Sequence, residues 1–189
     1  MKLSMMCGAF HTQYASRITQ HLMQPTIVSG PPRNRMLVAT PVAMQAVIVN
    51  SAEQLLLMSS PTRKNGWQTV SGAMDANETL LDGTLREIRE ELGPDLRVRP
   101  LGVFHVESFH FDDRVCYMLA CYYLLAYEGG EPQAGDDMVG SEIRWWDVDA
   151  LEATDEPLSI MARPWLMRRA VETYKLWCQQ PDMLLQLDI

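Results

Sequence analysis

No apolar run in this sequence approaches the length of a membrane span, and lysine and arginine are nowhere clustered as on nucleic-acid-binding surfaces. The formal net charge of -8 gives the chain no positive excess with which to bind a phosphate backbone. These absences argue against a membrane protein and against general nucleic-acid binding. The 189 residues suit one soluble domain with some additional sequence, for which we expect a cytoplasmic location.

Metal-binding cysteine motifs are also absent. The four cysteines are Cys7, Cys116, Cys121 and Cys178. They show neither CxxC nor zinc-site spacing, and the four histidines are not spaced as metal ligands. We therefore expect reduced thiols in an intracellular protein.

Acidic residues are missing from the first 52 positions. This bias is compatible with an organellar transit peptide as a minority alternative, but arginine is sparse there and no secretory apolar segment is present. The Ser-Gly-Pro-Pro run at residues 29–32 predicts a chain boundary. We expect an N-terminal arm over residues 1–35, which packs on the domain or on a second subunit, and one domain over residues 36–189.

Runs of apolar and β-branched residues bounded by turn residues predict strands. The expected strands are 42–50, 54–59, 67–71, 97–111, 115–127 and 142–148. The first two are expected to form a hairpin, and residues 112–114 to form a tight turn. A helical turn over residues 148–151 and an amphipathic helix from Pro164 to Gln179 follow. This order predicts an α/β fold in which a mixed sheet lies between helices.

The most informative helix is expected over residues 79–92. Thr79 and Asp82 have capping-box spacing, and Gly93 followed by Pro94 is a common helix exit. The apolar positions of this helix are Leu81, Leu85, Ile88 and Leu92. At about 100° per residue these four side chains share one narrow stripe, so we expect them to form the buried face.

Three glutamates of the same helix, Glu87, Glu90 and Glu91, fall in an arc about 100° wide that points away from the leucines. Like charges at this spacing repel one another, and the repulsion grows as water is lost, so a cation is needed to neutralise them. Oxygen ligands with room for water and phosphate oxygens favour Mg²⁺ or Mn²⁺ over zinc. For the triplet alone, a solvated helix face is the commoner explanation.

A longer pattern decides between these explanations. Its fixed positions are Gly72, Glu78, Arg86, Glu87, Ile88, Glu90, Glu91 and Gly93. They read G-x5-E-x7-R-E-U-x-E-E-x-G, where U is a bulky aliphatic residue, and the chance of this coincidence is on the order of one in a billion per starting position. The stretch resembles the signature of the Nudix hydrolases, with Pro94 in place of the usual final aliphatic residue.

The resemblance implies an α/β/α sandwich with a mixed sheet, covering about residues 36–179. It also implies that Glu87 and Glu91 are ligands of Mg²⁺ or Mn²⁺, and that Glu90 is a ligand or a proton acceptor. One of these glutamates, or an acid from a later loop, would be the general base, and Glu87 and Glu90 are the catalytic candidates. Glu78 and Arg86 are expected to form a salt bridge that orients the ligands.

Two further site expectations follow from the resemblance. Gly72 is expected to let the backbone turn tightly, and in the family a carbonyl near this point reaches the metal. A further acid often comes from the loop before the last strand. The candidates are Asp136, Asp137 and Glu142, ahead of Glu128 and Glu131, and each alone is more typical of solvated surface.

Substrate-binding residues are less well defined by the sequence. Side chains that could stack on a base are Trp67, Phe104, His105, Phe109, His110, Tyr117, Tyr122 and Tyr123. Aromatic residues in strands are more often part of the core. Arg63 and Lys64 lie where they could meet either phosphate or water.

The expected function is that of a metal-dependent pyrophosphohydrolase acting on a nucleoside diphosphate linked to another group, such as a nucleotide sugar, a dinucleotide or a nucleoside triphosphate. The alternatives are a Nudix-fold binding or regulatory module with little turnover and an enzyme similar to isopentenyl diphosphate isomerase. The partner is a small phosphorylated molecule, and a homodimer is a candidate assembly.

Subfamily motifs do not narrow the substrate. The SQPWPFPxS run of NADH-cleaving members, the LLTxR run of the coenzyme A type and the TNTCCSHP-like run of the isomerases are all absent. The run WQTVSG at residues 67–72 is similar to one in dihydroneopterin triphosphate pyrophosphatases.

Overall fold

The structure is a computed structural model that describes residues 26–28, 36–59, 66–111 and 117–181. The chain divides into two compact units, Met1–Val42 with Ser108–Leu119 and Ala43–Glu107 with Ala120–Ile189.

A short hairpin precedes the main sheet. β1 (Thr26–Val28) pairs antiparallel with β2 (Met36–Val38) in the first unit. Most of the predicted arm lies outside the described residues, so its boundary at residue 35 stays a prediction.

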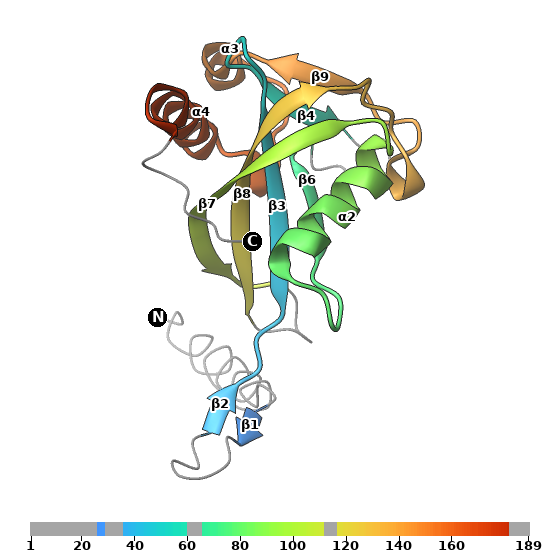
Figure 1. Cartoon of the computed structure of the whole chain (residues 1–189), viewed down its shortest axis with the longest axis vertical. Coiled ribbons are helices and arrows are strands. Elements are labelled where there is room, and N and C mark those ends of the chain that lie inside the picture. Colours follow the sequence, from blue (N-terminus) through green and yellow to red (C-terminus); the bar gives the residue numbers. More distant parts are fainter. Residues whose placement is uncertain (1–25, 29–35, 60–65, 112–116, 182–189) are drawn as a thin grey trace, which may run out of the picture. The chain divides into compact units, whose positions relative to one another are not determined.

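A seven-stranded sheet forms the centre of the fold as described (Figure 1). Its strands are β3 (Val42–Val49), β4 (Leu55–Ser59), β5 (Trp67–Gln68), β6 (Val70–Ala73), β7 (Arg97–Phe109), β8 (Met118–Gly129) and β9 (Ile143–Trp146). They are ordered β5-β4-β3-β8-β7, with β6 paired to β3 and β9 paired to β4. Figure 1 shows β3 and β8 running in the same direction, whereas β3 and β4 are antiparallel, so the sheet is mixed as predicted.

The predicted hairpin of β3 and β4 is confirmed, with Val49 opposite Leu55. Asn50 closes its turn, because the side-chain Oδ1 accepts hydrogen bonds from the backbone N–H groups of Ala52 at 2.9 Å and Gln54 at 3.0 Å. An asparagine that bonds the backbone two residues ahead mimics a backbone turn. The predicted tight turn at residues 112–114 lies outside the described residues.

The strand predicted over residues 67–71 is interrupted at Thr69 and changes partner there. β5 pairs with β4, whereas β6 pairs with β3 and places Gly72 opposite Met44. Thr69 is fully buried, and its hydroxyl donates to Gln45 Oε1 at 3.0 Å, which satisfies the buried polar group at the interruption. β6 therefore leads from the sheet directly to the loop that enters the next helix.

That helix, α2 (Leu80–Leu92), begins and ends where the sequence predicts. Thr79 Oγ1 accepts from the Asp82 backbone N–H at 3.1 Å, and the Asp82 side chain accepts from the Thr79 backbone N–H at 3.4 Å. This reciprocal capping box satisfies two of the backbone donors that a helix start leaves unpaired. Gly93 ends the helix with a φ of 85°.

The buried face of α2 includes most of the predicted leucine stripe and extends beyond it. Ile88 and Leu92 are each 1% exposed, the half-buried Leu85 packs against the same core, and Leu81 is half-buried. The other buried positions are Gly83, Thr84 and Glu91. A Cβ atom on Gly83 would lie 2.6 Å from Glu78 Oε1 and 2.8 Å from the Met44 side chain, so the glycine lets both side chains lie close to the helix.

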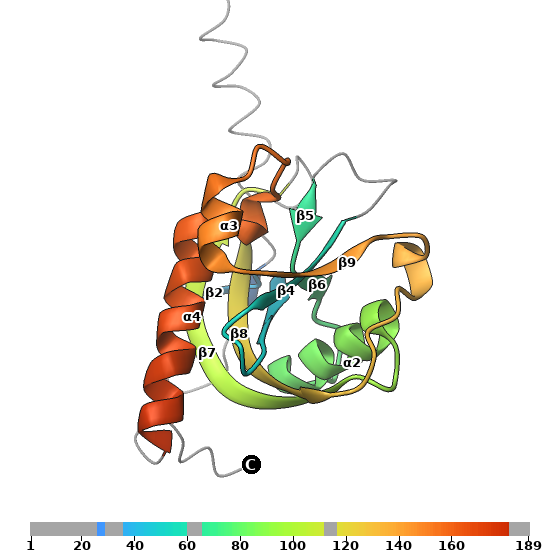
Figure 2. The same cartoon turned by 90° about the horizontal axis from the view of Figure 1, so that it is seen from above.

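Helices cover both faces of the sheet (Figure 2). α2 lies on one side, and α3 (Val148–Ala153) and α4 (Pro164–Gln179) lie on the other. The core on the α2 side contains Ala46, Ile48, Leu56, Met58, Val70, Ile88, Leu92, Leu96, Leu125 and Met138. The buried residues of α4 are Leu166, Met167, Ala170, Val171, Tyr174 and Trp177. The predicted α/β/α sandwich is thus confirmed, and α4 has the predicted bounds.

Two further observations bear on the sequence predictions. None of the helices in the described part of the chain is long and apolar enough to cross a membrane. Cys121 is a buried free thiol and Cys178 an exposed one, while Cys7 and Cys116 lie outside the described residues.

Two alanine substitutions can test which face of α2 is buried. Ile88→Ala should lower the free energy of unfolding by about 2–5 kcal/mol, because it leaves a cavity in a closed core. Leu81→Ala should cost well under half as much, because Leu81 is only half-buried. Urea denaturation of both variants measures the difference. Equal losses would show that the two residues share one buried stripe.

Candidate active site

Gly72 in β6 packs directly against the carboxylate of Glu87 in α2. A Cβ atom on Gly72 would lie 1.9 Å from Glu87 Oε1, so any side chain would displace that carboxylate. Gly72 is not among the described glycines with positive φ, and β6 continues through it to Ala73. The expectation of a tight turn at Gly72 is therefore wrong. The glycine instead leaves room for the Glu87 carboxylate to lie against the strand.

Arg86 joins the loop before α2 to the helix. Its Nε and Nη2 donate to the two carboxylate oxygens of Glu78 at 3.1 and 3.0 Å, and Nη2 also donates to the Ala73 carbonyl at 3.2 Å. Glu78 Oε1 accepts from the backbone N–H of Asp75 at 2.6 Å as well. The salt bridge expected between Glu78 and Arg86 is present, and it fixes both ends of the loop.

The remaining nitrogen of Arg86 is shared by two glutamates of α2. Nη1 donates to Glu87 Oε1 at 2.8 Å and to Glu90 Oε2 at 2.9 Å. One guanidinium group thus contacts three carboxylates, those of Glu78, Glu87 and Glu90. Charge-assisted bonds of this kind are stronger than neutral ones, so Arg86 offsets part of the repulsion within the cluster.

The three metal-ligand candidates differ in burial. The side chains of Glu87 and Glu90 are 15% and 41% exposed, whereas Glu91 is only 4% exposed. Glu91 therefore lies on the buried side of α2 with Leu92. This differs from the helical-wheel prediction that all three glutamates point away from the buried face.

Burial and hydrogen bonding shift two carboxyl pKa values in opposite directions. Burial raises the pKa of Glu87, and the bond from Arg86 counteracts only part of that effect. The hydrogen bond from Arg86, followed by that from the Asp75 backbone, lowers the pKa of Glu78. Glu78 is thus held ionised at the loop, while ionisation of Glu87 is disfavoured.

The loop before β9 is attached to the last turn of α2. The backbone N–H groups of Gln133 and Gly135 donate to the carbonyls of Leu92 at 2.9 Å and Glu91 at 3.0 Å. The short helix η1 (Asp136–Met138) follows at once. Asp136 is exposed and has a φ of 45°, an unusual backbone conformation for a residue other than glycine. This candidate acid therefore comes directly after the contact with α2.

The other acidic candidates have different surroundings. Glu142 Oε1 accepts from Arg144 Nη2 at 2.6 Å, and Glu128 Oε1 accepts from Arg99 Nε at 2.7 Å. Both glutamates are thus engaged in surface ion pairs. The side chain of Asp137 lies outside the described part of the structure, and Glu131 is exposed.

The carboxylate oxygens of this site are the kind of ligand that a hard divalent cation prefers, but they surround Arg86. Among the residues that the structure describes, no group of three or more His, Cys, Asp or Glu side chains converges as a ready metal site. Glu87 and Glu90 nevertheless place one oxygen each within 2.9 Å of the same cationic nitrogen. Carboxylate oxygens that converge on a positive charge are suitable ligands for Mg²⁺ or Mn²⁺. The residues present therefore fit the expected metal in chemistry.

The predicted stacking residues divide between core and surface. Trp67 is 3% exposed, and Tyr123 packs against the core on the α2 side. His105 and Tyr122 contact each other, with ring centroids 5.4 Å apart. Sequence reasoning missed Trp165, which it treated as one apolar residue of an amphipathic helix. Trp165 is 51% exposed, and no feature of the sequence distinguishes it from the buried residues of α4.

Comparison with known proteins places this geometry in a family. A model of the NUDIX domain matches residues 39–168. The chain belongs to the NUDIX family. The NAD-capped RNA hydrolase NudC of Chromobacterium violaceum is 33% identical to this NUDIX chain over 129 residues, which are 67% of this chain and 44% of that relative. This chain thus spans less than half the length of the curated relatives it matches.

Solved structures support the same fold. A NUDIX hydrolase from Clostridium perfringens has a TM-score of 0.60 and 13% identity, covering 72% of this chain and 99% of that one. The E. coli dihydroneopterin triphosphate pyrophosphohydrolase has a TM-score of 0.52 and 20% identity, covering 71% of this chain and 94% of that one. Identities this low show that the NUDIX fold is shared and nothing further.

The raised pKa of Glu87 predicts a pH-dependent stability in the metal-free NUDIX protein. The folded state disfavours the ionised carboxylate, so the wild type should lose stability as pH rises from below the ordinary pKa of 4.5 through the raised pKa. The Glu87→Gln variant should not show this loss. Urea denaturation from about pH 4 to about pH 7 measures the difference. A gap between the two proteins that stays constant with pH would contradict the assignment, and Glu131→Gln is an exposed control.

Proposed function

We propose that this NUDIX protein is a metal-dependent pyrophosphohydrolase that cleaves the diphosphate linkage of a nucleoside diphosphate joined to another group. One observation carries the proposal: Arg86 bonds Glu78, Glu87 and Glu90 beside Gly72. Concentrating acids in a half-buried site costs stability, and an arrangement that does so is typical of a functional centre.

The metal would be held by the carboxylates of Glu87, Glu90 and Glu91. When bound, Mg²⁺ or Mn²⁺ would offset the negative charge on the phosphate oxygens and lower the pKa of a bound water. Arg86 and Glu78 position these carboxylates by fixing the loop to α2, so their substitution would reduce activity through misplaced ligands.

The proton acceptor would be one of the acids near the end of α2. Glu90 is the most exposed of the three glutamates and is oriented by Arg86 at 2.9 Å. Glu87 is the second candidate, and Asp136 is a further acid whose backbone is fixed to the last turn of α2 through Gly135. A general base must reach the attacking water; Glu87 and Glu90 lie in the second half of α2, and Asp136 follows the loop that is bonded to its last turn.

The family and one named relative support the proposed substrate class. The NAD-capped RNA hydrolase NudC of Chromobacterium violaceum is 33% identical to this chain over 129 residues. A substrate in which a nucleoside diphosphate is joined to another group is consistent with that likeness. Because this chain covers only 44% of NudC, the identity of the second group stays open to a substrate panel.

Two alternative functions make different predictions. A NUDIX-fold binding module would bind nucleotide without turnover, and such a module usually lacks glutamates of the signature, all of which are present here. An enzyme similar to isopentenyl diphosphate isomerase would need the cysteine-containing run that this sequence lacks. A homodimer stays a prediction that light scattering would test.

Loss of a proposed metal ligand should abolish turnover and leave the fold intact. With Mg²⁺ present, Glu91→Gln should reduce nucleotide or phosphate release from the best substrate of a panel by about a hundredfold or more, because charge stabilisation dominates such reactions. Glu172→Gln, which changes an exposed glutamate of α4, is the matched control and should keep wild-type activity. Circular dichroism checks folding. Substantial activity in Glu91→Gln would remove that residue from the ligand set.

Metal binding can be measured without substrate. Titration of Mn²⁺ into the pure protein, followed by electron paramagnetic resonance, should show saturable binding at or below millimolar concentration. Glu87→Gln should weaken this binding, because it removes one oxygen ligand and one negative charge. Binding that is unchanged in this variant would place the ion elsewhere, and no binding at millimolar Mn²⁺ would contradict the proposed function.

A further inference from the structure

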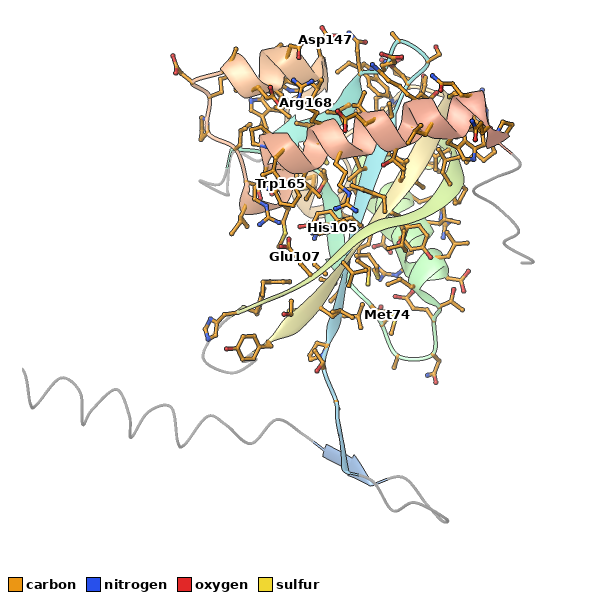
Figure 3. All side chains as sticks on the ribbon, turned by 90° about the vertical axis from the view of Figure 1, so that its left-hand side faces the viewer. Met74, His105, Glu107, Asp147, Trp165 and Arg168 are labelled. Carbon is orange, nitrogen blue, oxygen red and sulfur yellow. The ribbon has the colours of Figure 1, made fainter. Side chains whose placement is uncertain are left out.

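A second group of polar and aromatic side chains lies where β7 and β8 meet the start of α4, and the proposed reaction uses none of them. This group, called here the Trp165 cluster, consists of His105, Glu107, Tyr122, Met161, Arg163 and Trp165. Figure 3 shows His105, Glu107 and Trp165 close together beside the first turn of α4. Met161 comes from η2 (Ile160–Ala162), the short helix before α4.

Glu107 is fixed through only one of its two oxygens. Oε1 accepts a hydrogen bond from the Tyr122 hydroxyl at 2.7 Å and another from Arg163 Nη2. Burial, followed by the contact with Glu107, raises the pKa of Tyr122, so its hydroxyl stays a donor. Oε2 lies 4.0 Å from His105 Nε2, which is too far for a hydrogen bond. Within the described chain, this second oxygen is a positioned acceptor without a donor.

Trp165 presents a rigid ring to solvent. Its ring centroid lies 5.5 Å from that of His105 at an interplanar angle of 89°, and the guanidinium carbon of Arg163 lies 5.1 Å from the ring. These contacts hold the indole on two sides, yet Trp165 remains 51% exposed. A held, half-exposed tryptophan is a surface on which a second planar ring can stack at little entropic cost.

The same cluster contains two unsatisfied polar atoms. His105 Nε2 and Arg163 Nε are buried and have no hydrogen-bond partner among the residues that the structure describes. Buried polar atoms are nearly always paired with protein or ordered water, so a water molecule or a ligand atom would satisfy these two. Both belong to side chains that contact Trp165. Two polar atoms with room for a further partner therefore lie beside the exposed ring.

The charges of the cluster limit the kinds of ligand that it could bind. A phosphate group would meet the carboxylate of Glu107, and a metal ion would meet the guanidinium group of Arg163. A purely apolar ring would leave Glu107 Oε2 without a donor. A neutral planar ring that carries N–H groups on its edge avoids both charge conflicts and supplies the missing donor. Such a ring stacks on Trp165 and donates to Glu107.

We propose that the Trp165 cluster binds a planar heteroaromatic ring, which stacks on Trp165 and donates an N–H hydrogen bond to Glu107. The ring belongs either to the substrate of the proposed hydrolase, in which case the inference rests on that function, or to a separate nucleotide. Both sources share the same chemistry, and kinetics distinguishes them.

Equilibrium binding of nucleoside monophosphates to the metal-free protein tests the proposal directly. In calorimetry, AMP or GMP should bind saturably, while ribose 5-phosphate, which lacks the ring, should bind at least about tenfold more weakly. Trp165→Ala should weaken nucleotide binding about tenfold or more, and Trp165→Phe should restore most of it, because stacking needs any aromatic face. Leu176→Ala removes another exposed side chain of α4 and should change nothing.

The role of Glu107 has a separate readout. AMP should bind more tightly than purine riboside 5′-monophosphate, which lacks the exocyclic amine, and this preference should collapse in Glu107→Gln. Equal binding of ribose 5-phosphate and AMP, full binding by Trp165→Ala, or no saturable binding of either nucleotide would each overturn the proposal.

Two more measurements identify the molecule that carries the ring and test the two proposals separately. Competitive inhibition of hydrolysis by the bound nucleotide would assign the ring to the substrate, and saturable binding without inhibition would assign it to a second ligand. Glu91→Gln should bind AMP as the wild type does. If the wild type bound AMP through Trp165 but hydrolysed nothing, the proposed function would fail and the ring site would stand.

Discussion

The arginine at position 86 is the constraint on which the arrangement of α2 and its glutamates depends. Three carboxylates approach its guanidinium group within 3.1 Å, and two of them project from α2 itself. Without this charge, Glu87 and Glu90 would repel each other in a half-buried position at a cost that increases as water is excluded. Arg86 also reaches back to Glu78 and Ala73, so the same side chain that neutralises the helix fixes the loop leading into it.

Close contacts at two glycines also hold the glutamates of α2 in position. At one end, Gly72 lets the carboxylate of Glu87 lie against β6, where any side chain would displace it. At the other end, Gly135 bonds the Glu91 carbonyl, and a Cβ atom on Gly135 would lie 2.4 Å from the Glu90 carbonyl oxygen. Two glycines distant in sequence therefore allow a strand and a loop to approach α2 closely. The fold thereby holds the glutamates at defined positions, which the proposed function requires.

Local patterns in the sequence predicted much of this arrangement, because they concern interactions within a few residues. The capping box at Thr79, the exit at Gly93 and the bounds of α4 are of this kind. The burial of Glu91 and the role of Gly72 depend on how α2 rolls against β6, which an isolated helical wheel does not contain. Trp165 is the extreme case: its helix was predicted correctly, but how far its ring is covered depends on His105 of β7, which is remote in sequence.

The alternation of side chains along β8 explains how one strand serves two sites. Tyr123 packs into the core on the α2 side, whereas its neighbour Tyr122 donates to Glu107 in the Trp165 cluster. Successive residues of a strand face opposite sides of the sheet, so the glutamates and the Trp165 cluster lie on different faces. Among the described residues, the two groups have no side chain in common, and the sheet lies between them. Substitutions in the Trp165 cluster can therefore change the binding of a ring there and leave the charge balance around Arg86 unchanged.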